Sequence, residues 1–189
     1  MSNGESNPWN QLIKIEKNIK VPNFKDVSYN VIEFGAINDG NTFCTEAFRK
    51  AIEKCSKEGG GKVVIPAGKY LTGAIHLENN VNFHLEEGAE ILFSTNPDDF
   101  PIVHTSFEGL ELMNYSPLIY AKNKTNIAIT GSGVLNGQAN EKNWWPWKGS
   151  TSEGHTYGYV KGAPNQQDNG NLPALMEMSE NNIPLNKRV

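Results

Sequence analysis

The sequence predicts an all-β solenoid, a parallel β-helix with an α-helix over the open end of its first coil. Short apolar segments follow one another closely from 61 to 137, separated by glycine, asparagine and charged residues. Two of them, NVNFHLEEGAEIL (80–92) and NIAITGSGVLNG (126–137), share one strand–turn–strand pattern. An amphipathic helix is expected before them, at about 45–57. Repeated units of this kind indicate a solenoid, because each coil buries its inward side chains only by stacking on the next.

The first 28 residues are expected to form an extension with one short helix. Apolar residues from Trp9 to Val21 recur with loose helical spacing, and Pro22 ends the pattern. Residues 29–36 then alternate between apolar and polar side chains, as in a half-buried strand, and the turn residues at 38–41 break this strand.

The helix at about 45–57 has apolar residues at steps of three and four, and glycines at 59–61 end it. Its apolar face must cover other apolar surface. We therefore expect this helix to cap the first coil and to protect its unpaired strand edge.

The chain divides into the extension (1–28) and the N-terminal part of a β-helix domain (29–189). The coils are expected at about 61–137, with an irregular loop at 94–114 between them, and the region 138–189 is expected to be irregular apart from a short helix at 172–180. No second cap is recognisable, so we expect the β-helix to be incomplete at its C-terminus. The strands are predicted at 62–65, 69–71, 74–77, 81–85, 90–93, 118–121, 127–130 and 134–135.

Bulk composition does not set the partners of this protein. The 189 residues are 38% hydrophobic and 20% charged with a net charge of −4, unlike a basic nucleic-acid-binding surface. We expect no membrane span, since no apolar run approaches about 20 residues, and the first residues lack a secretory signal pattern. Cys44 and Cys55 are expected about 16 Å apart along the helix, too far for a disulfide. We expect no metal and no cofactor, and oligomeric state stays open.

Several strings resemble the polygalacturonase family, glycoside hydrolase family 28 of the pectin lyase-like superfamily. They are VIEFGAINDGNT (31–42), AFRKAIEKC (47–55), GGGKVVIPAGKYLTG (59–73), YSPLIYA (115–121) and IAITGSGVLNG (127–137), and the similarity covers roughly 29–189. The resemblance implies a right-handed parallel β-helix, an extracellular or periplasmic location, and inverting hydrolysis of pectic, galacturonic-acid-containing polysaccharide or oligogalacturonide by carboxyl groups about 6.5–9.5 Å apart.

The family's catalytic motifs, Asn-x-Asp, Asp-Asp, Gly-His-Gly and Arg-x-Lys, do not map onto this sequence, so we expect no catalytic residue in it. Asn96, Asp98 and Asp99 imitate two of these motifs within one proline-containing loop, where turn formation is the better interpretation. His155 lacks the second flanking glycine and is interpreted as a surface residue.

Trp144, Trp145 and Trp147 follow the last recognisable coil, and their aromatic faces are suited to stacking on sugar rings. They are the candidate substrate-binding residues, although packing against the β-helix wall is a competing interpretation that we favour slightly. Weaker candidates for substrate contact are Glu108, Tyr115, Lys142, Lys148 and His155.

Three functions remain open from the sequence. The first is the N-terminal portion of a pectin-directed hydrolase, inactive alone. The second is a non-catalytic β-helix module that binds polysaccharide or has a structural role. The third is a relative of rhamnogalacturonases, lyases or epimerases, which share the opening strings; a calcium-dependent lyase would need a cluster of carboxylates that the sequence does not provide.

Overall fold

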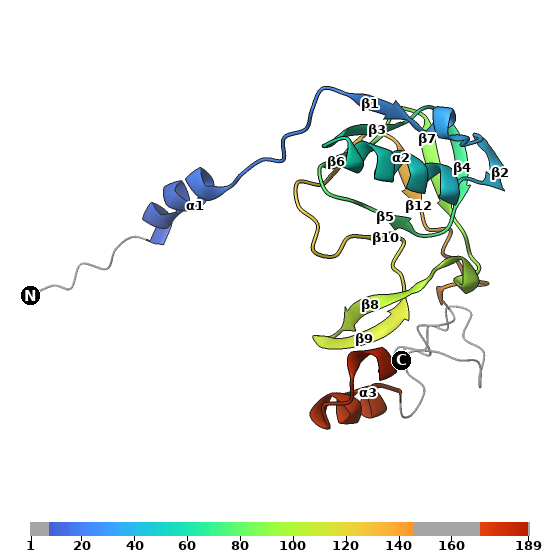
Figure 1. Cartoon of the computed structure of the whole chain (residues 1–189). Helices are drawn as coiled ribbons and strands as arrows, with labels where there is room; N and C mark the ends of the chain where they lie inside the picture. Colours follow the sequence, from blue (N-terminus) through green and yellow to red (C-terminus); the bar gives the residue numbers. More distant parts are fainter. Residues whose placement is uncertain (1–7, 146–170, 189) are drawn as a thin grey trace, which may run out of the picture.

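Three parallel sheets wind around one core in the computed structural model, which describes residues 8–145 and 171–188 (Figure 1). One sheet has the order β1 (Ser28–Asn30), β3 (Gly61–Ile65), β6 (Val81–Leu85) and β11 (Ala128–Gly131). A second has the order β2 (Asp39–Phe43), β4 (Gly68–Thr72), β7 (Ala89–Phe93) and β12 (Val134–Asn136). The third pairs β5 (Ile75–His76) with β10 (Ile119–Tyr120). Every pairing within these sheets is parallel, and each of the strands predicted between 62 and 135 lies within two residues of an observed one.

The sheets enclose an apolar core because inward and outward side chains alternate along each strand. Val63 on β3, Phe83 on β6 and Ile91 on β7 are fully buried. Along β3 and β7, the positions that alternate with the buried ones are partly exposed. The turns between coils also stack. Asn80 and Asn126 both have positive φ, 63° and 54°, and the Asn126 side-chain amide donates to Asn80 Oδ1 over 3.0 Å. Asparagine suits this conformation because its short side chain bonds locally.

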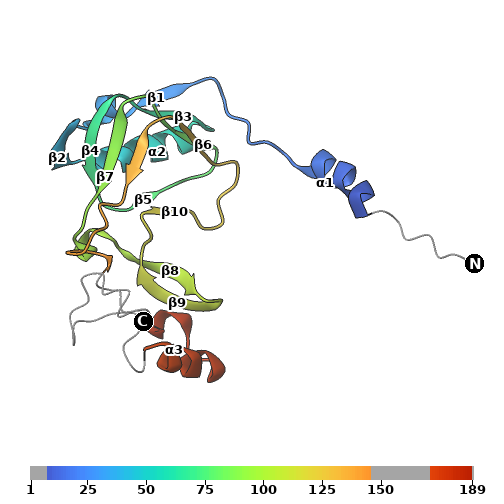
Figure 2. The same cartoon turned by 180° about the vertical axis from the view of Figure 1, so that it is seen from behind.

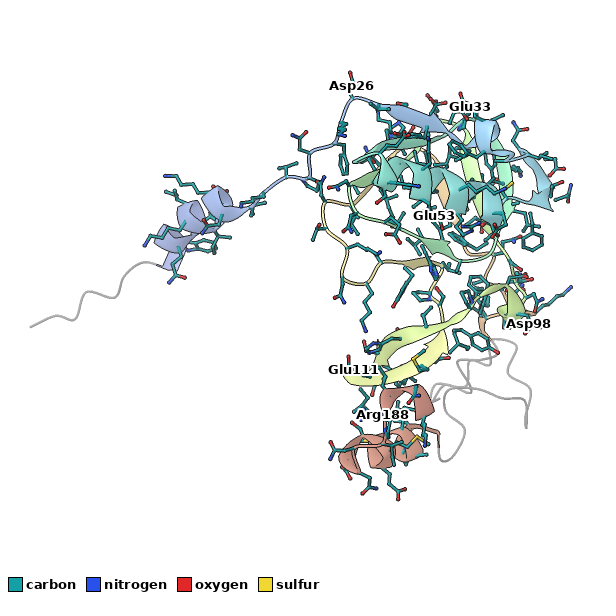
Figure 3. The ribbon with its side chains drawn as sticks, viewed as in Figure 1. Asp26, Glu33, Glu53, Asp98, Glu111 and Arg188 are labelled. Carbon is teal, nitrogen blue, oxygen red and sulfur yellow. The ribbon has the colours of Figure 1, made fainter. Side chains whose placement is uncertain are left out.

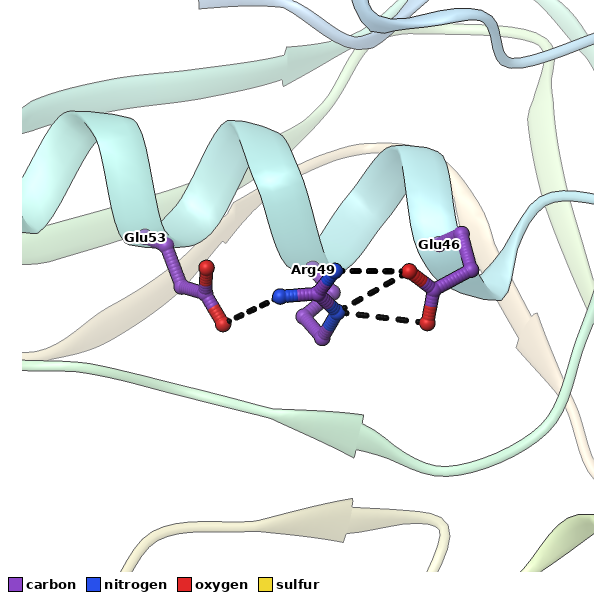
Figure 4. Close-up of polar contacts among 3 residues, drawn as sticks. All are labelled: Glu46, Arg49 and Glu53. Carbon is purple, nitrogen blue, oxygen red and sulfur yellow. Dashed lines mark hydrogen bonds and ion pairs between the residues drawn. The ribbon is translucent and has the colours of Figure 1, made fainter.

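Helix α2 (Thr45–Lys57) lies beside β3 and β6 with one face buried (Figure 1). Phe48, which is 1% exposed, lies with its ring 6.0 Å from that of Tyr70 and 5.9 Å from that of Phe83. On the opposite, solvent-exposed face, Arg49 forms ion pairs of 2.7 Å with both Glu46 and Glu53 (Figure 4). The predicted helix at 45–57 is confirmed.

The predicted strand at 29–36 is wrong beyond its second residue. β1 ends at Asn30, and a 3-10 helix, η2 (Val31–Phe34), follows. The Asn30 side chain accepts a hydrogen bond from the Ile32 amide at 3.0 Å, and Gly35 ends the turn at a φ of 96°. The segment 38–41, predicted as a turn, contributes to β2, whose pairing with β4 is irregular.

The predicted irregular loop at 94–114 is also wrong in its second half. After η3 (Pro97–Asp99), strands β8 (Ile102–Phe107) and β9 (Leu110–Tyr115) form an antiparallel hairpin that projects from the stack (Figures 1 and 2). Glu108 and Gly109 form its turn, with φ of 49° and 87°. Positive φ at both central residues matches the twist of a two-residue hairpin.

The predicted short helix at 172–180 is confirmed as α3 (Asn171–Glu180), which packs against β9 and precedes η5 (Leu185–Lys187). The Met113 amide donates to the Arg188 carbonyl at 2.7 Å and joins this end of the chain to the hairpin.

The predicted N-terminal helix is confirmed as η1 (Pro8–Gln11) and α1 (Leu12–Asn18), which stand clear of the stack in both views (Figures 1 and 2). Cys44 and Cys55 are free and buried. Within 8–145 and 171–188, no helix combines the length and apolar character needed to cross a membrane.

Candidate functional site

Three polar side chains from successive coils meet on the outer face of the β2-β4-β7-β12 sheet. Lys69 on β4 pairs in register with Glu90 on β7, and its ammonium lies 3.3 Å from a Glu90 oxygen. The Asn136 side-chain amide, at the end of β12, donates to the other Glu90 oxygen at 2.9 Å. These bonds, that from Asn136 first, hold the pKa of Glu90 below its ordinary value. We call Lys69, Glu90 and Asn136 the polar row.

The turn after β12 connects the polar row to the tryptophans. The Gln138 amide N–H donates to Asn136 Oδ1 at 2.9 Å, and its side chain donates to the Phe93 carbonyl at 2.7 Å. Gln138 itself has a φ of 54°. These bonds fix the chain against the end of β7 before it reaches Asn140.

The predicted tryptophans do not share one environment. Trp144 packs against the core, with its ring 5.7 Å from that of Phe100 in an edge-to-face arrangement. The Trp145 side chain is 41% exposed. Trp147, Lys148 and His155 lie outside the described residues. The two described tryptophans therefore differ in exposure, since Trp144 packs against the core and Trp145 reaches the surface.

Of the weaker candidates for substrate contact, the structure describes Glu108, Tyr115 and Lys142. Glu108 lies in the turn of the hairpin, and Tyr115 ends β9 with 45% exposure. The Lys142 amide N–H donates to Asn140 Oδ1, an ordinary turn bond. The polar row itself was missed by the sequence analysis, since its members are separated by 21 and 46 positions and only the coil register brings them together.

The aspartates that imitate catalytic motifs have turn roles. The Asn96 side chain accepts from the Asp98 amide at 3.2 Å and so caps η3, and Asp99 accepts from the Ser94 hydroxyl. Asp98 is exposed and points away from the stack (Figure 3). Gly73 lies so close to this loop that a Cβ there would overlap the Asp99 carbonyl. These contacts stabilise the conformation of the loop, and none of them indicates a catalytic role for the aspartates.

Two residues of the YSPLIYA string hold neighbouring coils together. His76 Nε2 lies 3.0 Å from the Ser116 hydroxyl, and its ring lies 5.1 Å from that of Tyr120. Burial lowers the pKa of His76 from its ordinary value. Ser116 is buried, so this pair serves packing rather than nucleophilic chemistry. In the described part of the chain, no three His, Cys, Asp or Glu side chains gather closely enough to hold a metal ion.

The stacked parallel sheets define the class of this protein, a right-handed parallel β-helix of the pectin lyase-like type. A family profile described as rhamnogalacturonase A/epimerase, pectate lyase-like matches residues 28–86. The chain is 32% identical over 127 residues to a probable polygalacturonase of Vitis vinifera, which covers 62% of this chain and 26% of that protein. It is also 32% identical over 116 residues to an exo-poly-alpha-D-galacturonosidase of Dickeya chrysanthemi, covering 57% of this chain and 19% of that protein.

Among solved structures, a hyperthermoactive exopolygalacturonase from Thermotoga maritima matches with a TM-score of 0.84 and 44% identity. The match covers 94% of this chain and 38% of that one. These similarities support a polygalacturonase-like family for the chain. It spans between 19% and 26% of the curated relatives named above.

Proposed function

We propose that this chain is the N-terminal portion of a glycoside hydrolase that acts on pectic, galacturonic-acid-containing polysaccharide by inverting hydrolysis. The observation that carries the proposal is the 44% identity to the Thermotoga maritima exopolygalacturonase across 94% of the chain. The profile match at 28–86 alone would not separate a hydrolase from an epimerase, because its description names both. The whole protein would work where pectic material is found, outside the cell or in a periplasm.

The pKa shifts of the described carboxyl groups give no support to a general acid among them. A general acid that works near neutral pH needs a raised pKa. Within the described residues, every carboxyl group with a displaced pKa has it lowered. The backbone amides of Thr42 and Asn41 lower the pKa of Asp39, and Asn136 and Lys69 lower that of Glu90. We therefore propose that the catalytic carboxylates belong to sequence beyond this chain, and that this chain alone is inactive.

The part that this chain contributes is substrate contact at Trp145 and the polar row. An exposed indole offers a large apolar face, and the Lys69 ammonium and the Asn136 amide offer donors to hydroxyl or carboxylate oxygens. The ligand would be a pectic polysaccharide or an oligogalacturonide.

The test compares this chain with the complete product of its reading frame on polygalacturonate. We expect reducing ends from the complete protein and none from this chain, and NMR of the first product should show an inverted anomeric configuration. Dose-dependent release by this chain alone would overturn the assignment of the carboxylates. An unsaturated, ultraviolet-absorbing product from the complete protein would instead identify a lyase.

A non-catalytic polysaccharide-binding module is the second candidate, and the 41% exposure of the Trp145 side chain favours it over a purely structural role. Binding without release of reducing ends by the complete protein would establish it. In either case, Trp145→Ala should weaken binding to oligogalacturonide by about tenfold, equivalent to roughly 1.4 kcal/mol. Trp144→Ala serves as the matched variant, because it should lower the melting temperature instead.

A further inference from the structure

The hairpin of β8 and β9, together with α3 and η5, is set apart from the stacked coils in both views (Figures 1 and 2). The two strands pair along their full length, and α3 and η5 pack on β9. We call β8, β9, α3 and η5 the hairpin lobe. At the base of the hairpin, the Ser116 amide N–H donates to the Pro101 carbonyl at 2.8 Å, and the chain returns to the stack. Contacts beyond this base decide how closely the lobe lies against the coils.

Two side chains from the segment of β10 reach one residue of the lobe, His104 on β8. The Tyr120 hydroxyl donates to the His104 carbonyl at 2.8 Å, and the Lys122 ammonium bonds to His104 Nδ1. Within the hairpin, His104 Nε2 lies 2.8 Å from Glu111 Oε1. The His104 side chain is 26% exposed. His104 therefore joins the hairpin lobe to the coil that contains β10.

The partners of the His104 ring fix its protonation state. A lysine ammonium has donors and no acceptor, so Nδ1 must hold a lone pair in order to accept from Lys122. Nε2 then carries the hydrogen and donates it to the Glu111 carboxylate. The bonded arrangement thus requires a neutral imidazole with its hydrogen on Nε2.

A proton added at Nδ1 abolishes the bond to Lys122. Histidine side chains commonly gain this proton between about pH 5 and pH 8. The new N–H would face the Lys122 ammonium, so an acceptor is lost and two positive charges come into contact. The bond from His104 Nε2 to Glu111 becomes an ion pair, and it lies wholly within the hairpin. Protonation therefore weakens the contact between lobe and stack while the hairpin keeps its own contacts.

Other charged groups near this contact bond elsewhere. Lys124, two positions after Lys122, pairs with Glu78 at 2.5 Å. Beside β9, the Arg188 guanidinium donates to the Ile183 carbonyl at 2.7 Å. The bond between the ring and Lys122 therefore depends on the protonation state of the ring itself.

His76 is a second histidine on this side of the stack. Its ring lies 5.1 Å from that of Tyr120, and its Nε2 lies 3.0 Å from the Ser116 hydroxyl. Burial lowers the pKa of His76, so this ring gains a proton at lower pH than an ordinary histidine. A pH response that survives the loss of the His104 imidazole would thus belong to another group, with His76 the first to consider.

We propose that the bond between Lys122 and His104 is a pH-sensitive latch, which holds the hairpin lobe against the stack near neutral pH and releases it in acid. The bond exists only while the ring is neutral. When the ring is protonated, the bond from Tyr120 remains at this contact, and the position of the lobe becomes variable. A hydrogen bond to a charged group is strong enough to change the population of the displaced lobe by about tenfold.

The test measures the position of the lobe in the full chain by double electron–electron resonance between two spin labels. One label is attached at Glu108→Cys in the hairpin turn, and the other at Lys50→Cys on the exposed face of α2. Cys44 and Cys55 are buried and so are protected from labelling. On going from pH 8 to pH 5, we expect the population with a displaced distance to rise about tenfold.

Three variants in the labelled chain assign the response. His104→Gln keeps an acceptor for Lys122 and a donor for Glu111 but takes up no proton, so the lobe should stay in place at both pH values. Lys122→Met removes the latch and should displace the lobe equally at both pH values. Lys124→Met is the matched control and should keep the wild-type response within about twofold.

Several results would overturn the proposal. A wild-type distance that is the same at pH 8 and pH 5 would show that the lobe is not released. A response that persists in His104→Gln would assign the titration to another group, and one that persists in full in Lys122→Met would show that this contact is not the latch. Circular dichroism that reports loss of secondary structure in the wild type at pH 5 would mean unfolding in place of release, which also contradicts the proposal.

Discussion

Replacing Phe48 with alanine tests our proposal that α2 caps the β-helix. The ring is 1% exposed and lies against Tyr70 and Phe83, so its removal leaves a cavity that the flanking strands cannot fill. Truncation of a buried phenylalanine costs about 3–5 kcal/mol. The two ring pairs, worth about 0.5–1.5 kcal/mol each in isolation, place Phe48 towards the upper part of that range. Urea unfolding followed by circular dichroism should therefore show a loss of about 4 kcal/mol.

Arg49→Ala, one position along the same helix, is the matched control. Arg49 and its partners Glu46 and Glu53 are about half exposed or more, and such pairs contribute little, so the loss should be below about 1 kcal/mol. If Phe48→Ala also costs less than about 1 kcal/mol, the α2 face does not seal the core and the capping proposal fails. A drop in the m-value with little change in midpoint would point instead to a denatured-state effect.

Two further predictions concern the backbone and the pH dependence of stability. Gly131→Ala should destabilise the protein by at least about 2 kcal/mol, because φ is 98° and the new Cβ would overlap the Leu85 carbonyl. Gly35 is the matched control, since it has a similar φ of 96° with open space around it, and Gly35→Ala should cost about 1 kcal/mol. Equal losses of stability in the two variants, measured by urea unfolding, would refute the steric argument. The hydrogen bond to Glu58 is the main cause that raises the pKa of Tyr29 to about 12, from about 10 when unfolded. The contribution of this hydrogen bond to the free energy of unfolding is complete below pH 10 and is lost as pH rises towards 12. The stability of Tyr29→Phe should therefore decline less than that of the wild type in this window. Parallel plots of stability against pH for the two proteins would contradict the assignment.

Most of the coil strands could be predicted because their signal is local. In β6, the inward positions Val81, Phe83 and Leu85 are apolar, and the turn asparagine at 80 precedes them, as Asn126 precedes β11. Burial on one face is enough to produce this alternation.

The errors arise where a side-chain cap or an atypical turn overrides the apolar pattern. The sequence at 31–34 is apolar enough for a strand, but the Asn30 side chain captures the Ile32 amide and a 3-10 turn results. In the hairpin, two prolines before β8 and a Glu108-Gly109 turn conceal the pairing, since Asn-Gly or Asp-Gly is the usual signal.

The candidate site was predicted less completely than the fold. Trp144 and Trp145 could be identified as aromatic residues after the last coil, but their different exposure depends on where Phe100 lies, which the sequence does not indicate. The polar row depends on register. Lys69 and Glu90 are one coil apart, but the coil from Glu90 to Asn136 contains the hairpin, which lengthens the interval to 46 residues.

The hairpin leaves the stack after β7, and the chain returns to pair in unbroken parallel register. Gly61 pairs with Val81, 20 residues on, whereas Asn82 pairs with Ala128, 46 residues on, and the ladder on both sides is regular. The length of the chain that leaves the stack after β7 therefore does not alter the packing of the core. Segments between coils can be lengthened, shortened or exchanged while the buried layers keep their partners, so that the wall beside a ligand can be altered independently of the fold that supports it.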